Sequence, residues 1–496
     1  MRKRTTKGNH LTPSLLEPQS RGGDIAEGGF SFQDNVILAR IPIWLAQDGF
    51  TAMVKEATSD VEAKFFVPGY GFVKDLIEVK DHVLQPTEFW NEIKRFQQID
   101  AGSPKTYRRF TLVGAGVSKE LHPLLNGLQR VQGSQDFYDE HDTVIHNSVQ
   151  EYVDLVKKKG GTQKDALFLI DKVTVEIHWN TAKYDGEAVF NKKLIEYLNE
   201  YVDLSGRIII DIYNNMSTFI RKNKNRTIFR RELENKLQEK IPTSQKPPFR
   251  SISIYTATTP QDDPLHPGLR FDWECFSGGE TRVMPAPDQW DKLLIDLQNT
   301  RTWIENYRNT KRILLLGNRR LSACLAIGSV FSAVRGYVIE MDYRGENLAT
   351  NSHPNTETPA YPLASNLIEG EGKSIVVSVS IHSNNLIDVQ HNLAKFGLSD
   401  APLLEIQGEQ PIISVEQANW IVGNLKKQLV WHLQSTNCQE IHLFLTSPAY
   451  LALFLGHRLD ATAPIICYGW GENRQYYQTC RLFANITDLS NTKFIT

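Results

Sequence analysis

The chain has 496 residues, a length at which two or three domains are expected rather than one core. Its hydrophobic residues (41%), charged residues (23%) and formal net charge of −2 are those of a soluble globular protein, and no apolar run reaches the roughly 18 residues of a membrane span. The five cysteines form no CxxC pair, which argues against a zinc ribbon or a disulfide framework and indicates a reducing cytoplasm.

Composition divides the chain into segments. Residues 1–23 are polar and basic, contain glycine and proline, and are predicted to be disordered, with no apolar segment that would make them a secretory signal. Residues 24–245 form the first predicted domain. Two polar, proline-rich stretches at 241–250 and 256–270, with a short strand-like segment at 251–255 between them, predict a linker at 246–270, which is followed by a second domain at 271–496.

The first domain is predicted to begin with a helix that is followed by three strands. A further helix and an apolar strand come next, and helical periodicity recurs in the remainder. The predicted elements are a helix at 30–46, strands at 52–56, 60–66 and 75–80, a helix at 86–98, a strand at 109–113, and helices at 147–159, 191–202 and 228–240.

The strand at 75–80 ends in Glu78-Val-Lys80. Side chains alternate along a strand, so Glu78 and Lys80 point to the same side, and Asp60 at the start of the preceding strand reaches the same edge. We expect Asp60 and Glu78 to bind Mg²⁺ or Mn²⁺, which activates a water, while Lys80 orients the nucleophile or stabilises the developing charge. The alternative is a solvated strand face, the usual outcome for an ExK tripeptide.

The order of these elements resembles the core of the PD-(D/E)xK nucleases over about residues 28–116. The resemblance implies a restriction-endonuclease-like fold and a metal-dependent nuclease. Ser59 stands where the family name has proline, and Glu56 is either an additional ligand or only the end of a strand. The residues at the catalytic motif positions of the family are Gln33, Asp60, Glu78 and Lys80.

A basic segment with no acid inside it lies near the end of the first domain. Such a stripe fits a nucleic-acid backbone. The alternative is a solvated helix end and loop. The predicted DNA contacts are Arg221, Lys222, Lys224 and Arg226.

Two stretches of the second domain, residues 313–341 and 441–469, repeat each other without a gap, and Gly328 falls on Gly456. Each copy predicts a strand, a short polar turn, a helix and a second strand. Helix N-termini carry unpaired N–H groups and a partial positive charge. Two of them related by a pseudo-twofold axis suit a ligand with several phosphates.

Between the two copies, short β-branched strands alternate with helices. This alternation predicts a parallel sheet with helices on its faces, and therefore an α/β fold. The predicted elements are strands at 375–380 and 403–406 and helices at 386–396 and 415–433.

Candidate ligand-binding residues lie in the two turns and at the strand ends. Arg319 or Arg320 is expected to pair with a phosphate bidentately. A helix that opens after Pro448 leaves N–H groups for another phosphate, and aromatic side chains at late strand ends are expected to stack on bases. The candidates are Asn318, Arg319, Arg320, Ser322, Ser380, His382, Thr446, Ser447, Pro448, Ala449, Tyr468 and Trp470.

Simpler roles remain open for several of these candidates. Ser447 is also a plausible helix cap, since serine caps helices well. Tyr468 and Trp470 are also plausible core residues, and His382 a structural histidine.

Residues from about 271 to 483 resemble the SAVED domain, a fusion of two CARF-like Rossmann units. The residues that carry the resemblance are the duplicated strand–turn–helix, above all 440–456 (EIHLFLTSPAYLALFLG), and the closing strand at 465–470. Together with the nuclease core, the chain resembles the SAVED endonucleases of bacterial CBASS anti-phage defence.

This resemblance implies a function for the whole chain. A cGAS/DncV-like nucleotidyltransferase would supply a cyclic di- or trinucleotide as activator. The SAVED domain would bind it, the protein would form a homo-oligomer, and the nuclease would cut double-stranded DNA in the bacterial cytoplasm without a membrane partner. The alternatives are a non-catalytic cyclic-nucleotide receptor and a ligand-independent restriction-type nuclease.

Overall fold

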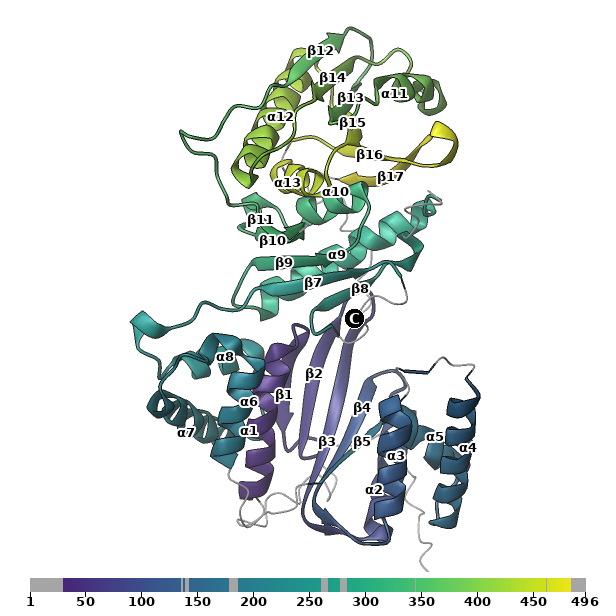
Figure 1. Cartoon of the computed structure of the whole chain (residues 1–496), viewed down its shortest axis with the longest axis vertical. Coiled ribbons are helices and arrows are strands. Elements are labelled where there is room, and N and C mark those ends of the chain that lie inside the picture. The colour runs from purple at the N-terminus through teal and green to yellow at the C-terminus, as the bar shows by residue number, and fades with distance from the viewer. Residues whose placement is uncertain are drawn as a thin grey trace, which may run out of the picture. The chain divides into compact units, whose positions relative to one another are not determined.

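The computed structural model describes residues 30–134, 137–138, 142–177, 186–259, 266–276, 283–343, 345–460 and 462–482. Residues 1–23, predicted to be disordered, lie outside these ranges. The chain divides into two compact units, Met1–Pro248 and Phe249–Thr496 (Figure 1). Within the described ranges, no helix is long and apolar enough to cross a membrane. None of the five cysteines forms a disulfide.

A six-stranded sheet forms the centre of the first unit, in the order β5-β4-β3-β2-β1-β6. β1, β2 and β3 are antiparallel neighbours, whereas β3, β4 and β5 run parallel because helices connect them. The strands are β1 (Phe50–Lys55), β2 (Val61–Val67), β3 (Gly71–Leu84), β4 (Tyr107–Val117), β5 (Val173–Ile177) and β6 (Thr227–Phe229).

Helices cover both faces of this sheet. Alternate strand residues point to opposite faces, so Ile77 and Val113 belong to one buried hydrophobic cluster and Leu76 and Leu112 to another. The first face carries α1 (Phe30–Ala46), α6 (Gly186–Tyr197), α7 (Gly206–Lys222) and α8 (Arg230–Gln238), and the second α2 (Pro86–Gly102), α3 (His122–Ser134), α4 (Thr143–Lys158) and α5 (Gln163–Lys172).

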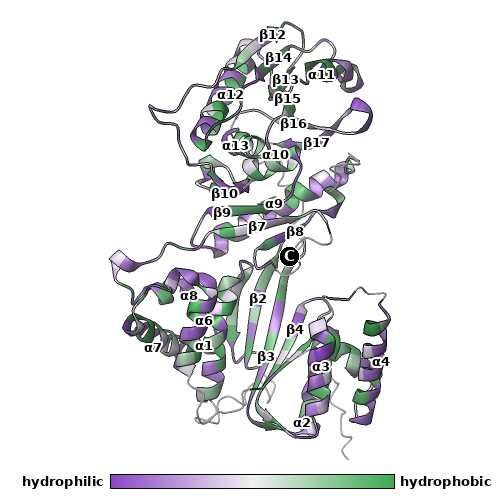
Figure 2. Ribbon diagram, in the orientation of Figure 1, coloured by the Kyte–Doolittle hydropathy of each residue, from purple (hydrophilic) through white to green (hydrophobic). Residues whose placement is uncertain are grey.

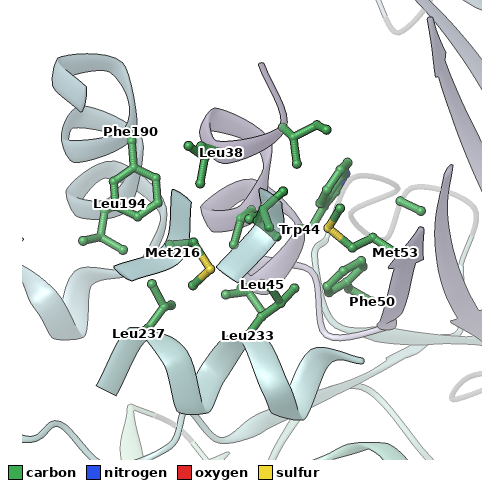
Figure 3. Packing of buried hydrophobic residues seen from close by; sticks show 14 of the residues in the cluster. Leu38, Trp44, Leu45, Phe50, Met53, Phe190, Leu194, Met216, Leu233 and Leu237 are labelled. Carbon is green, nitrogen blue, oxygen red and sulfur yellow. The ribbon is translucent and has the colours of Figure 1, made fainter. Parts of the chain in front are cut away.

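The helix α1 is the centre of the first hydrophobic cluster. Figure 3 shows Leu38 and Leu45 of α1 among side chains from α6, α7 and α8. On its other side, Trp44 stacks on Phe50 of β1 with ring centroids 5.6 Å apart. Full burial of one such side chain contributes about 1.5–3 kcal/mol. In Figure 2 the covering helices α3, α4 and α7 alternate hydrophobic and hydrophilic residues, as amphipathic helices on a sheet do.

The second unit contains two sheets, in the orders β11-β10-β9-β7-β8 and β12-β14-β13-β15-β16-β17. Their inner strands run parallel, and β11, β12 and β17 add antiparallel edges. The strands are β7 (Ile252–Ala257), β8 (Leu269–Asp272), β9 (Arg312–Gly317), β10 (Val338–Tyr343), β11 (Glu346–Ala349), β12 (Ala364–Ile368), β13 (Ser374–Ile381), β14 (Leu403–Gly408), β15 (Glu440–Thr446), β16 (Ile465–Trp470) and β17 (Tyr476–Leu482). The helices are α9 (Pro287–Tyr307), α10 (Leu321–Val330), α11 (Leu386–Asn392), α12 (Val415–Ser435) and α13 (Ala449–Arg458).

The predicted repeat is confirmed, because β9–α10–β10 and β15–α13–β16 have the same element order at the same spacing. The two helices pack directly on each other through their glycines. A Cβ on Gly328 would lie 2.2 Å from the Leu453 carbonyl oxygen, and a Cβ on Gly456 would lie 2.2 Å from the Leu325 carbonyl oxygen. This reciprocal contact is the signature of a pseudo-twofold axis between the copies.

Two predicted boundaries are wrong. Residues 246–270, predicted as a linker, include β7 and most of the short strand β8, so the second unit begins before residue 271. The strand-like segment at 251–255 corresponds to β7, six residues long, and its pairing with β9, about 60 residues later, which makes it part of the second unit, gives no local signal. The helix predicted at 228–240 begins at Arg230, because Thr227–Phe229 pairs with β1.

Candidate functional sites

Asp60, Glu78 and Lys80 come together at one edge of the first unit's sheet. Asp60 lies in the turn between β1 and β2, and the pairing of Val61 with Ile77 places it beside the middle of β3, next to Glu78. Its Oδ2 accepts a hydrogen bond of 2.6 Å from the Val79 N–H. Burial, and then the charge of Glu78, raise the pKa of the Asp60 carboxyl to about 8, although the Val79 N–H acts in the opposite direction.

Two residues of α2 that the sequence did not single out, Glu92 and Arg95, complete this site. The Lys80 Nζ lies 3.0 Å from Glu78 Oε1 and 2.9 Å from Glu92 Oε1. The Arg95 Nη1 lies 2.9 Å from Glu78 Oε2 and 3.1 Å from Glu92 Oε2. Burial lowers the pKa of Lys80, but the charges and hydrogen bonds of the two glutamates outweigh it, so the net shift is upward. Lys80 is therefore held as a cation.

The carboxylates fit a hard divalent cation. Asp60 and Glu78 offer oxygen ligands only, which is the donor type that Mg²⁺ and Mn²⁺ take. Burial, and then repulsion by Glu78, raise the pKa of Asp60, and a bound cation would stabilise the ionised carboxylate against both. Within the described ranges no group of three or more His, Cys, Asp or Glu side chains is arranged to hold a metal. A cation here would therefore take its remaining ligands from water or substrate.

Gln33, the fourth predicted catalytic residue, is buried on α1. No hydrogen bond joins it to Asp60, Glu78 or Lys80 among the residues described. Its neighbour Asp34 belongs instead to a separate buried ion pair, with 2.5 Å between its Oδ1 and Lys55 Nζ.

The predicted DNA contacts are all exposed, and three of them pair with acids that are distant in sequence or in the next helix. Arg221 Nε lies 2.9 Å from Asp34 Oδ2, and Lys224 Nζ lies 3.5 Å from Glu56 Oε2. Arg226 Nη2 lies 2.7 Å from a carboxylate oxygen of Glu232 in α8. The positive charge of this segment is partly neutralised, and contact with DNA stays a prediction.

A cavity of about 700 Å³ lies in the second unit where β9, β15 and β16 end. It contains side chains from both turns of the repeat. The predicted residues that line it are Asn318, Arg319, Arg320, Ser322, Thr446, Tyr468 and Trp470. The two copies of the repeat thus contribute to one site.

The two arginines of the first turn differ in their bonding. Arg320 donates from Nε to the Phe276 carbonyl (3.0 Å) and from Nη2 to the Val283 carbonyl (2.6 Å). Arg319 donates from Nη2 to the Gly317 carbonyl, but its Nε and Nη1 are buried without a hydrogen-bond partner. Burial lowers the pKa of Arg319. Arg319 is thus the cation best placed to pair with an anionic ligand in the cavity.

Asn385, which the sequence did not single out, connects three parts of the cavity wall. Its Oδ1 accepts hydrogen bonds from the hydroxyls of Ser378 (2.7 Å) and Ser380 (2.5 Å). Its Nδ2 donates to Thr446 Oγ1 (3.0 Å) and Tyr476 Oη (3.1 Å). The available signal was its position in the loop that follows β13, since loops at the carboxyl ends of parallel strands present ligand-binding residues.

Tyr468 combines a core role with its place in the cavity wall. Its ring stacks on Phe444 with centroids 4.1 Å apart, and its hydroxyl bonds His442 Nδ1 at 2.8 Å. Trp470 meets Tyr476 edge to face at 5.0 Å. One face of the Tyr468 ring is therefore already occupied.

Five predicted ligand-binding residues do not line this cavity. Ser380 is buried and bonded to Asn385. His382 and Pro448 line a smaller cavity of about 380 Å³. Neither Ser447 nor Ala449 lines either cavity, and Ser447 does not cap α13, whose N-cap is Pro448. From this part of the chain only Leu445 and Thr446, the last two residues of β15, line the larger cavity.

Comparison with known proteins finds one sensor-domain family and two relatives that match along nearly the whole chain. The family model of the SMODS-associated and fused to various effectors sensor domain (SAVED) matches residues 297–482. CD-NTase-associated protein 4 of Moraxella osloensis is 28% identical over 95% of this chain and 100% of its own length. The protein of the same name from Acinetobacter sp. (strain ATCC 27244 / 9458) is 27% identical over the same shares.

Solved structures show the same fold along nearly the whole chain. The Acinetobacter baumannii Cap4 SAVED/CARF-domain containing receptor with the cyclic trinucleotide 2'3'3'-cAAA matches with a TM-score of 0.81 and 25% identity, over 92% of this chain and 99% of that one. The Moraxella osloensis Cap4 receptor matches with a TM-score of 0.77 and 26% identity, over 92% of this chain and 100% of that one. The sensor-domain match covers the duplicated unit and the cavity turns, and together with these relatives and solved structures it supports a SAVED-domain effector of the CBASS type.

Proposed function

We propose that this protein is a metal-dependent endonuclease of double-stranded DNA that is activated when a cyclic trinucleotide binds in the second unit. The observation that carries the proposal is the convergence of Asp60, Glu78 and Lys80 in one unit of a chain whose other unit has a cavity lined by Arg319, a guanidinium with two nitrogens that lack a hydrogen-bond partner among the described residues. The proposed fold of the first unit is that of the PD-(D/E)xK nucleases.

The residues of the first unit would have different roles in phosphodiester hydrolysis. Asp60 and Glu78 would hold Mg²⁺ or Mn²⁺, which when bound neutralises phosphate charge and lowers the pKa of a water. Lys80 stays protonated between its carboxylates. It can therefore donate a charge-assisted hydrogen bond to a phosphate oxygen, whose negative charge grows in the transition state.

The cavity of the second unit offers complementary groups to a cyclic oligonucleotide. Its volume of about 700 Å³ falls in the range of ordinary ligand sites. Arg319 would pair with one phosphate, and the first N–H groups of α10 would face another. Asp388, which also lines the cavity, offers a carboxylate to base or ribose, and Asn385 holds the wall of the cavity in place through the four hydrogen bonds of its side chain. A cyclic trinucleotide occupies the similar A. baumannii receptor.

Activation is proposed to occur through homo-oligomerisation. One nuclease core cuts one strand, so a double-strand break requires two cores close together. The nucleotide shifts the assembly equilibrium only if the assembled protein binds it more tightly than the free protein. Light scattering is expected to show a larger mass with saturating nucleotide, and an unchanged mass would refute this step.

The function is tested by incubating the protein with plasmid DNA and Mg²⁺, with and without a panel of cyclic di- and trinucleotides. Cleavage is expected with one nucleotide only and is expected to disappear in Lys80→Ala. Lys74→Ala is the matched control, because Lys74 lies on the same strand but pairs with Glu62. Nucleotide-independent cleavage would identify a restriction-type nuclease. Nucleotide binding without cleavage would identify a non-catalytic receptor.

A further inference from the structure

Glu92 and Arg95 of α2 close a ring of four alternating charges with Glu78 and Lys80. All four contacts are between 2.9 and 3.1 Å, and the side chains are only 12–20% exposed. Ion pairs at this burial are screened much less than surface pairs. The ring is therefore a defined arrangement rather than a loose surface cluster.

The ring fixes the direction of the Lys80 ammonium. This group has three N–H donors. Glu78 on β3 and Glu92 on α2 each accept one hydrogen bond from this ammonium. Without Glu92 the ammonium would be held by a single carboxylate on its own strand, and it could rotate about that contact.

Arg95 connects the ring to the turn that carries Asp60. Its Nη1 contacts both glutamates, and its Nη2 donates to the carbonyl oxygen of Thr58 at 2.5 Å. Thr58 is two residues before Asp60, and the Glu56 N–H bonds the Asp60 carbonyl across the same turn at 2.8 Å. Arg95 therefore joins this turn to Glu78 on β3.

The helix that supplies these two residues is itself rigidly placed. Phe89, Ile93 and Phe96 of α2 are fully buried in the second hydrophobic cluster. Glu92 and Arg95 lie one turn apart on the same helix. A packed helix holds supporting side chains more accurately than a loop.

We propose that Glu92 and Arg95 are positioning residues of the nuclease site. Glu92 orients Lys80 toward the phosphate, and Arg95 fixes the separation between Asp60 and Glu78. This inference rests on the proposed nuclease function. It assigns neither residue a contact with DNA or with metal.

The first test replaces Glu92 by Gln. Both neighbours of Glu92, Lys80 and Arg95, are donors only. Whichever way the new amide turns, its NH₂ group faces one of these donors, so one bond of the ring is lost. We expect kcat for plasmid cleavage, with saturating nucleotide and Mg²⁺, to fall about 10- to 100-fold, as for other supporting residues. KM for DNA is expected to stay within about twofold, since a loss confined to kcat marks an interaction outside substrate binding.

Glu88→Gln is the matched control. Glu88 lies on the same helix and pairs with His82 at 3.0 Å. A histidine ring nitrogen can donate or accept, so this amide keeps a partner and activity is expected to be unchanged. Equal activity of the two variants would overturn the role of Glu92. A higher KM with unchanged kcat for Glu92→Gln would also overturn it, because Glu92 would then act on DNA binding.

Arg95→Lys separates geometry from charge. Lysine keeps the charge but has a single nitrogen, which cannot reach both glutamates and the Thr58 carbonyl together. We expect Arg95→Lys to lose kcat nearly as strongly as Arg95→Gln, at temperatures below the unfolding midpoint of each variant. Full activity of Arg95→Lys would show that only charge matters and would overturn the proposal for Arg95. If the wild-type protein cuts no DNA with any nucleotide, the proposed function fails, and the positioning roles fail with it.

Discussion

Two ionisable side chains, Asp60 and Arg319, are poorly compensated inside the protein, one in each unit. Burial and Glu78 raise the pKa of Asp60, and burial lowers the pKa of Arg319. In both cases the free protein disfavours the charged form. Each residue lies where a ligand of opposite charge is proposed, and such perturbed groups are common at functional sites.

Asp60 is expected to make stability depend on pH. Its pKa is about 8 in the folded protein and near 3.8 in the unfolded chain. Between these values the folded state binds a proton that the unfolded state does not, so stability falls as pH rises from about 4 to about 8. Asp60→Asn removes this dependence. Denaturant unfolding in EDTA measures the free energy of unfolding of both proteins. The value for Asp60→Asn minus the value for wild type should be a few kcal/mol larger at pH 8 than at pH 5. An equal difference at the two pH values would contradict this.

Mg²⁺ is expected to stabilise the first unit through Asp60. A cation that binds only the folded state raises stability by RT ln(1 + [L]/Kd). At pH 8 the wild-type unfolding midpoint should rise with added Mg²⁺, whereas that of Asp60→Asn should not. The same shift in both proteins would place the cation elsewhere.

Arg319→Gln is expected to weaken nucleotide binding without lowering the stability of the free protein. A charge-assisted hydrogen bond to phosphate contributes about 1.5–3 kcal/mol, which is roughly 10- to 100-fold in affinity. The free protein loses a buried guanidinium with two unpaired nitrogens, so its unfolding midpoint should not fall. Calorimetric titration with 2'3'3'-cAAA and 3'3'3'-cAAA checks the affinity. Arg312→Gln, at a pair outside the cavity, is the control. Unchanged affinity in Arg319→Gln would exclude Arg319 as the phosphate ligand.

At the scale of elements, the helix pair α10–α13 holds the two turns of the cavity together. The helices approach so closely because neither glycine has a side chain at the contact. The turns directly before these helices supply Arg319 and Thr446. The geometry of the cavity therefore depends on a contact between backbones.

Gly328→Ala and Gly456→Ala are each expected to destabilise the second unit. The added methyl group would meet a backbone carbonyl, which cannot move aside, and such overpacking costs about 1–3 kcal/mol or more. Gly423→Ala in α12 is the control, because its Cβ would meet nothing within 4 Å. It should stabilise by about 0.4–1 kcal/mol. Thermal unfolding measures all three, and equal midpoints would contradict the close packing.

The sequence predicts most elements of the second unit because its signals are local. The repeat aligns the two strand–turn–helix units, and this alone brings Asn318 and Thr446 to one cavity. Asn385 was missed because its partners Thr446 and Tyr476 are 61 and 91 residues away.

Separation along the chain also explains which site residues of the first unit the sequence predicts and which it misses. The spacing of Glu78 and Lys80 along one strand is visible in the sequence, and Asp60 is one hairpin away. Glu92 and Arg95 have ordinary helical spacing, so only the packing of α2 reveals their contact with Lys80 and Glu78. The basic segment looked unpaired because Asp34, the partner of Arg221, is 187 residues earlier in the chain.

At the scale of the whole molecule, the chain combines two units whose proposed ligands have opposite charges. The first offers carboxylates to a cation, and the second offers a guanidinium to phosphates. Neither proposed ligand can substitute for the other. The two binding events can therefore be followed separately in the intact protein.

Each ligand is expected to stabilise its own unit in the full-length chain. In calorimetric scans, a cyclic trinucleotide at 100 times its Kd should stabilise the second unit by about 2.7 kcal/mol. At the same nucleotide concentration this shift should persist in Lys80→Ala and fall to about 0.4–1.4 kcal/mol in Arg319→Gln, as a roughly 10- to 100-fold weaker affinity requires. A nucleotide shift that is lost in Lys80→Ala but kept in Arg319→Gln would place the nucleotide in the first unit.

The repeat is symmetric in its backbone but not in its chemistry. Arg319 and Arg320 of the first turn correspond to Ser447 and Pro448 of the second. A uniformly linked cyclic trinucleotide has three identical orientations in such a site, a statistical advantage of about threefold, or about 0.6 kcal/mol. An isomer in which one of the three linkages differs lacks this statistical advantage. It can, however, bind with the differing linkage either at the turn that carries Arg319 and Arg320 or away from that turn. Unequal halves thus give a duplicated fold the means to distinguish linkage isomers of the same composition.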